Sequence, residues 1–279
     1  MSATTIRRVN ENRVGMMLRE WRQRRRLSQL DLALDAGVSS RHLSFVETGR
    51  SRPSPEMVLT LAQRLEVPLR ERNRLLLAAG YAPRFQQRSF EAPELAPVRD
   101  AVGRLLAGHE PYPALAVDTA WNLVASNGAL GLLLEGVADD LLVPPANCMR
   151  LALHPDGLAP RILNLGEWRG HLLARLRREA ALRRDPRLDD LLAEVDAYPG
   201  EDHVERSGTD IMVTLRLASS VGDLTLFSTV TTFGTAADIT VAELSIEAFF
   251  PADDATAEAL RSAAAEVAAP APQLEAGSG

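Results

Sequence analysis

Residues 28–54 read SQLDLALDAGVSSRHLSFVETGRSRPS, and this stretch decides the fold of the first part of the chain. Ser28 and Ser39 each precede a run of helix-forming residues, and a serine hydroxyl there accepts an N–H that the first turn of a helix leaves unpaired. Gly37 and Gly49 end the two runs, because the left-handed backbone at a helix end favours glycine. The pattern predicts two short helices joined by a tight turn.

Apolar residues in these two helices recur on one face. Leu32 and Ala33 face inward from the first helix, and Leu43 and Val46 bury the inner face of the second. The side chains left outward near the first turns of the second helix are Ser40, Arg41, Ser44 and Phe45. A further helix begins at Ser54-Pro55, since proline is well tolerated at the first helical position. We expect residues 14–82 to form an all-α domain of five helices.

The stretch resembles the helix-turn-helix of the XRE family, the lambda repressor type, over about residues 14–79. The family pattern is S/T-Q-x-x-L-A-x-x-x-G-V-S-x-x-x-I/L-S-x-x-E-x-G-x-R-x-P-S. The positions that match it in register are Ser28, Gln29, Leu32, Ala33, Gly37, Val38, Ser39, Leu43, Ser44, Glu47, Gly49, Arg52, Pro53 and Ser54. The resemblance implies a domain that binds a double-stranded DNA operator.

The resemblance also implies roles for individual residues. It makes Gln29 a phosphate contact and gives Arg50 and Arg52 the same role after the second helix. The residues that it places at or near base edges are Ser39, Ser40, Arg41, Ser44 and Phe45. Phe45 has two readings that the sequence leaves open, contact with a thymine methyl or a partly buried core position. Arg22 and Glu47 match a structural ion pair between the first and third helices of the family.

The net charge of −6 hides an asymmetry between the two parts of the chain. Residues 1–88 hold 17 Arg against 8 acidic residues, about +9, whereas residues 89–279 hold 14 Arg against 29, about −15. A basic module joined to an acidic one is typical of a nucleic-acid reader with a regulatory partner domain.

The remaining boundaries follow from composition. Residues 1–13 are polar and are predicted to be a flexible arm, and residues 83–96 are proline-rich and are predicted to be a linker. Residues 97–268 carry helical patterns followed by three strand-like runs, the last of them ITVAELSIEAFF at 239–250. Residues 269–279 are predicted to be a disordered tail. The whole is therefore an α+β chain.

The segment from Tyr112 to Asn127 and the N-x-x-R-L segment at Asn147 resemble the C-terminal domain of MmyB-like regulators. The order of helices and then three strands indicates a PAS-like antiparallel sheet with helices on one face, and the resemblance implies that the domain binds an apolar ligand, with a fatty acid as precedent. Because one helix-turn-helix reads only a half-site, we also expect this domain to supply dimer contacts. Side chains that we expect in the pocket wall, unless they are ordinary core, are Trp121, Cys148, Met149, Trp168, Met212, Phe227, Phe233 and Phe249. Cys148 is either a sensor of oxidants or electrophiles or a small buried hydrophobe.

Catalytic patterns are missing from the sequence. The five His are scattered, the single Cys excludes an intrachain disulfide, and His154 with Asp156 offers only two ligands to a metal. We expect neither an enzyme, a cofactor nor a membrane segment, but a cytoplasmic homodimer. Two functions stay open: a ligand-responsive regulator, with repression favoured, or a DNA-binding scaffold whose acidic domain recruits another protein.

Overall fold

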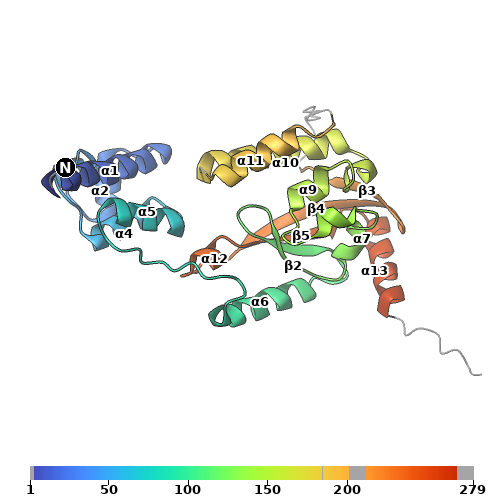
Figure 1. The fold of residues 1–279 in the computed structure, drawn as a ribbon. Helices are drawn as coiled ribbons and strands as arrows, with labels where there is room; N and C mark the ends of the chain where they lie inside the picture. Colours follow the sequence, from blue (N-terminus) through green and yellow to red (C-terminus); the bar gives the residue numbers. More distant parts are fainter. Residues whose placement is uncertain (1–2, 184, 201–211, 269–279) are drawn as a thin grey trace, which may run out of the picture. The chain divides into compact units, whose positions relative to one another are not determined.

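A computed structural model describes residues 3–183, 185–200 and 212–268 (Figure 1). The chain divides into two compact units, each with its own hydrophobic core. Unit 1 comprises residues 1–92 together with 233–242, and unit 2 comprises residues 93–232 and 243–279. The predicted tail at 269–279 lies outside the described residues.

Unit 1 contains the predicted five-helix domain. Its helices are α1 (Ala3–Arg24), α2 (Gln29–Ala36), α3 (Ser40–Glu47), α4 (Pro55–Arg64) and α5 (Leu69–Ala78). The local signals in the sequence act as expected: the Ser28 hydroxyl accepts the Asp31 N–H at 3.1 Å, and the Asp31 carboxylate accepts the Ser28 N–H at 2.9 Å. Gly37 ends α2 with a φ of 66°. The all-α fold of this domain is confirmed.

The first residues of α1 differ from the expectation. Residues 3–13, predicted to be an arm, are helical in α1, because no Pro or Gly interrupts them.

Gly15 lies where α1 passes the end of α3, and a Cβ there would be 2.2 Å from the carbonyl oxygen of Val46. Close approach therefore depends on glycine at this position.

The predicted linker 83–96 is also partly folded. The Asn73 side chain on α5 donates to the Phe85 carbonyl at 2.7 Å and accepts the N–H groups of Arg84 and Phe85 at 2.9 and 3.0 Å. The end of the segment, Pro93–Leu95, forms a single 3-10 turn that leads into the first helix of unit 2. The side chain of Asn73 therefore holds Arg84 and Phe85, within the predicted linker, against α5.

Unit 2 is built on a five-stranded antiparallel sheet in the order β2-β1-β5-β4-β3. Its strands are β1 (Ala114–Val117), β2 (Leu123–Ser126), β3 (Leu215–Ser219), β4 (Gly222–Thr232) and β5 (Ser245–Pro251). Its helices are α6 (Ala96–Ala107), α7 (Leu130–Leu133), α8 (Asp139–Leu142), α9 (Cys148–Leu153), α10 (Leu165–Arg183), α11 (Pro186–Asp196) and α13 (Asp254–Ala268), with a 3-10 turn at Ala159–Arg161. The predicted α+β class is confirmed.

Helices cover both faces of the sheet rather than the one face expected. Figure 1 shows α10 and α11 on one side of the sheet and α6 on the other. Ile246 and Glu247 are neighbours on the central strand β5, so they point to opposite faces, yet each is only 6% exposed. The acidic residue on the α10 side is thus as buried as the isoleucine.

The run 239–250, predicted to be one strand, splits into α12 (Ile239–Ala242) and β5. The Asp238 carboxylate accepts the Thr240 N–H at 2.9 Å and starts the helix. Ile239 and Val241 are buried in unit 1. Residues 233–242 follow β4, include α12 and belong to unit 1, and we call them the β4–β5 insertion.

The insertion is tied to the chain before residue 93 by three polar contacts. The Ile239 N–H donates to the Gln86 carbonyl at 2.8 Å, the Thr240 hydroxyl donates to the Arg88 carbonyl at 2.5 Å, and the Arg88 guanidinium lies 2.8 Å from the Asp238 carboxylate.

Among the described helices, none combines the length and the apolarity that a membrane crossing requires.

Candidate nucleic-acid interface and ligand cavity

The outward face of α3 carries the residues predicted to read bases. Ser40 and Arg41 are exposed, and Ser44 and Phe45 are partly exposed. The Arg41 guanidinium lies 5.5 Å from the centre of the Phe45 ring, so the two side chains form one surface feature. Phe45 is therefore neither a fully buried core residue nor a free aromatic ring.

Ser39 is the N-cap residue of α3. Its hydroxyl accepts the His42 N–H at 3.2 Å and so stabilises the first turn of α3. Its side chain fixes the start of the helix that presents Ser40 and Arg41.

A buried network holds α3 against α1 and α2. Arg22 Nε lies 2.6 Å from Glu47 Oε1 and its Nη2 lies 2.9 Å from Oε2, a bidentate pair. The Gln29 amide donates to the same Glu47 Oε2 at 2.8 Å. Hydrogen bonding to Glu47 raises the pKa of Arg22. Gln29, expected at phosphate, is thus also part of the support of α3.

Arg50 is exposed in the turn after α3, and so is Arg52, whose guanidinium is also bonded within unit 1. Its Nε donates to the Ala79 carbonyl at 3.0 Å, its Nη2 donates to the Gly80 carbonyl at 3.3 Å, and its guanidinium lies 4.5 Å from the centre of the Tyr81 ring. These contacts engage the guanidinium at the C-terminal end of α5. They give Arg52 a structural role, and its phosphate contact stays a prediction.

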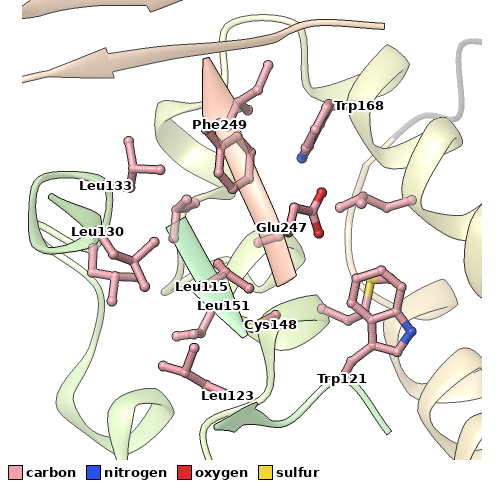
Figure 2. A pocket seen from close by; sticks show the side chains of 16 residues that line it. Leu115, Trp121, Leu123, Leu130, Leu133, Cys148, Leu151, Trp168, Glu247 and Phe249 are labelled. Atoms are coloured by element: carbon pink, nitrogen blue, oxygen red, sulfur yellow. The ribbon is translucent and has the colours of Figure 1, made fainter. Parts of the chain in front are cut away.

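Unit 2 contains an apolar cavity between the sheet and helices α7, α9 and α10 (Figure 2). The cavity has a volume of about 80 Å³, and the wider space between its lining side chains, which includes the opening to solvent, is about 650 Å³. Nine of the sixteen lining residues are leucines, contributed mainly by three strands and three helices: Leu115, Leu123, Leu130, Leu133, Leu134, Leu151, Leu158, Leu172 and Leu215.

Most of the predicted wall residues do line this cavity. They are Trp121, Cys148, Met149, Trp168 and Phe249. Met212 is instead 55% exposed. Phe227 stacks on Phe250 at 5.4 Å and does not line the cavity, because Leu224 and Leu226 fix the inward side of β4 and the strand period turns Phe227 elsewhere. Phe233 belongs to unit 1.

The sequence did not identify Glu247 or the leucines as cavity residues. Leucines are the commonest core residues and carry no distinguishing signal. Glu247 did offer one, since it stands between apolar residues in the strand run SIEAFF, where a charge on a buried face is unusual.

Cys148 lines the cavity with a partly buried side chain, in surroundings that suit a small hydrophobe better than a sensor. Burial, followed by the carboxylates of Glu247 and Asp118, raises the pKa of its thiol to about 12. The thiolate is the reactive form of cysteine, and this environment suppresses it.

Trp121 is held in place by the polar residues of the Tyr112–Asn127 segment. The Asp118 carboxylate accepts the N–H groups of Ala120 and Asn122 at 2.8 and 2.9 Å, and the Asn147 amide donates to the Ala120 carbonyl at 2.8 Å. This turn supports a positive φ of 65° at Trp121. The polar positions of the segment are therefore structural, and they set one wall of the cavity.

A helix-turn-helix unit joined to a domain with an apolar cavity defines a class, the transcriptional regulators that combine a DNA-binding domain with a ligand-binding domain. Comparison with known families agrees: residues 18–72 match a model described as helix-turn-helix, and residues 98–263 match one described as MmyB-like transcription regulator ligand binding domain. The second match spans more than half of the chain, so the protein belongs to the MmyB-like transcription regulators.

One curated relative is the Uncharacterized HTH-type transcriptional regulator RghRB of Bacillus subtilis (strain 168). It is 38% identical over 81 residues, which are 29% of this chain and 56% of that protein. The similarity thus spans only about half the length of the relative.

Proposed function

We propose that this protein is a cytoplasmic, homodimeric repressor that binds its operator through α3 and binds an apolar small molecule, such as a fatty acid or another acyl compound, in the cavity of unit 2. Ligand binding changes the affinity for the operator. The single observation that carries the proposal is the leucine-lined cavity within the domain that matches the ligand-binding family model.

The DNA-binding part of the proposal rests on the outward face of α3. Arg41 is exposed at its first turn, where a guanidinium reaches a base edge in the major groove, and Arg50 lies in the turn that follows. One such helix reads only a half-site, so two copies placed about 34 Å apart give useful affinity and specificity. Unit 2 is proposed to hold the dimer, because the positive charge of residues 1–88 opposes self-association of unit 1.

The ligand acts by a shift of population. A bound molecule moves an equilibrium between two dimer arrangements only by its differential affinity for them, and a hundredfold preference supplies about 2.7 kcal/mol. The alternative, a scaffold that recruits a protein, predicted a solid core. The cavity therefore favours the ligand-responsive function.

The test begins with the full-length protein stripped of lipid and an operator selected from random DNA. Acyl compounds are added, and both ligand binding and operator affinity are measured. Ala152→Phe fills the cavity from α9 and should abolish ligand binding and the response while operator binding persists. Ala193→Phe, on the exposed side of α11, is the matched control and should respond as the parent does.

If no acyl compound binds and no small molecule can be extracted from the purified protein, the ligand-responsive function is wrong. Sedimentation of the full chain at micromolar concentration tests the dimer, and a monomer there would contradict that part of the proposal.

A further inference from the structure

The apolar lining of the cavity is broken by one ionisable carboxylate, that of Glu247 on β5. Figure 2 shows this carboxylate projecting between Trp121 and Trp168, with leucines around it. Its side chain is 8% exposed. An ionised carboxylate in apolar surroundings is costly unless it is paired and hydrogen-bonded, so the neighbours of Glu247 decide what it can do.

The partners of Glu247 leave part of its bonding capacity unused. The Ser228 hydroxyl donates to Oε1 at 2.8 Å, and Arg175 Nη1 lies 3.4 Å from Oε1 and 3.3 Å from Oε2. A carboxylate offers about four acceptor sites. Within the described residues, the contact of Oε2 is thus a single long one, and this oxygen has room for a donor from a molecule in the cavity.

The charge around Glu247 is also incompletely balanced. Arg175 is shared between two carboxylates, because its Nε lies 3.4 Å from Glu179 Oε1. Its guanidinium also lies 4.3 Å from the centre of the Trp121 ring, which fixes its direction. One cation that serves two anions leaves this end of the cavity negative, and a second carboxylate placed there by a ligand would be repelled.

We propose that Glu247 is the anchor for the polar end of the ligand and that this end is a hydrogen-bond donor. The ligand is then an apolar chain or ring system that ends in an alcohol, amide or amine, rather than in the carboxylate of a free fatty acid. This inference rests on the proposed binding of an apolar small molecule, and it replaces the fatty acid named there by molecules whose polar end is a hydrogen-bond donor.

The position of Glu247 in the sheet adds a reason for selectivity. It pairs in register with Leu115 of β1 on one side and with Val230 of β4 on the other, so the backbone of the central strand holds it. A carboxylate on a buried central strand has little freedom to swing into solvent. A ligand therefore meets the carboxylate in a fixed place.

The test compares ligands that differ only in the polar end. Alcohols, amides and ionised fatty acids of matched chain length are titrated into the full-length protein at pH 8, and binding is followed by fluorescence. Trp121 and Trp168 line the cavity, so they report occupancy directly. We expect the alcohol or the amide to bind about tenfold or more tightly than the carboxylate, because a donor to a charged acceptor is strong and two like charges repel.

Two variants separate the anchor from its surroundings. Glu247→Gln keeps the shape and removes the charge, so it should lower the preference for the alcohol over the carboxylate by about tenfold. Glu179→Gln removes the other carboxylate on Arg175, which does not line the cavity, and should leave the ranking of ligands unchanged.

The ranking measured on the parent protein needs no variant and is decisive alone. A carboxylate that binds the parent as tightly as the matched alcohol and amide would overturn this inference and leave the proposed ligand-binding function intact. An equal loss of preference in both Gln variants would also overturn it. Absence of binding by every member of the series would refute the inference and the ligand-binding function together.

Discussion

Removal of the Glu47 side chain should destabilise the DNA-binding unit strongly. Glu47→Ala removes the carboxylate and with it three hydrogen bonds, two donated by Arg22 at 2.6 and 2.9 Å and one donated by Gln29 at 2.8 Å. Bonds of this kind contribute about 1.5–3 kcal/mol each, but Arg22 keeps its bond to the Leu27 carbonyl at 2.8 Å. The loss expected on breaking such a buried pair is about 3–5 kcal/mol.

That loss is a large part of the free energy of unfolding of a small domain, which is about 5–15 kcal/mol. Hydrogen exchange measured peptide by peptide resolves unit 1 from unit 2 in the full-length protein, and protection should fall across α1, α2 and α3. The control is Glu20→Ala, which alters an exposed i,i+4 pair with Arg24 at 2.9 Å and should cost less than about 1 kcal/mol.

The double variant Arg22→Met, Glu47→Leu sharpens the test. Replacing both charges by apolar side chains removes the unpaired guanidinium, so most of the lost stability should return. The reasoning fails if the double variant is as unstable as Glu47→Ala, or if Glu47→Ala costs no more than Glu20→Ala.

Three further outcomes follow from single side chains. Arg41→Ala should lower discrimination at one operator base pair by about 1–3 kcal/mol, seen in competition between operator variants, and unchanged preference would contradict base contact. Arg52→Ala should lower the stability of unit 1, because the bonds to the Ala79 and Gly80 carbonyls are lost, without changing the slope of log affinity against log salt; a flatter slope would instead indicate a phosphate contact. Because the Cys148 thiol has its pKa raised from 9.0 to about 12 in the fold, its contribution to stability is present below pH 9 and is lost as pH rises toward 12. Cys148→Ala should remove that part of the pH dependence in chemical unfolding, and an identical profile in parent and variant would contradict it.

The helix-turn-helix was predictable because its signals are local. Ser28, Gly37 and Ser39 cap or end helices through bonds to residues within a few positions, so the sequence alone contains both partners. The same holds for α11, which Asp185 and Pro186 start. The three strand-like runs within residues 97–268 likewise indicated a sheet.

The structure of the linker, of the β4–β5 insertion and of the cavity wall depends on partners that are distant in sequence. Asn73 fixes the segment at Phe85, and Gln86 and Arg88 receive the β4–β5 insertion, 150 residues away in the case of Arg88 and Asp238. A β-branched run such as ITVA favours a strand by itself, but here the Asp238 carboxylate caps its first turn, and Ile239 and Val241 are buried. The composition of the cavity wall was partly predictable from aromatic and sulfur-bearing residues, whereas its leucines and Glu247 required the sheet register.

The β4–β5 insertion means that the DNA-binding unit is discontinuous in the gene. The chain passes between the units at 92–93, at 232–233 and at 242–243. A fragment cut at residue 92, or a chimera that grafts residues 1–92 onto another sensor, would omit the buried Ile239 and Val241 and the carboxylate that pairs with Arg88. Such exchanges assume that the DNA-binding and ligand-binding domains are separate segments of the sequence. In this protein they would produce an incomplete DNA-binding unit. A recombinant that keeps the DNA-binding unit whole therefore has to include the β4–β5 insertion together with helices α1 to α5.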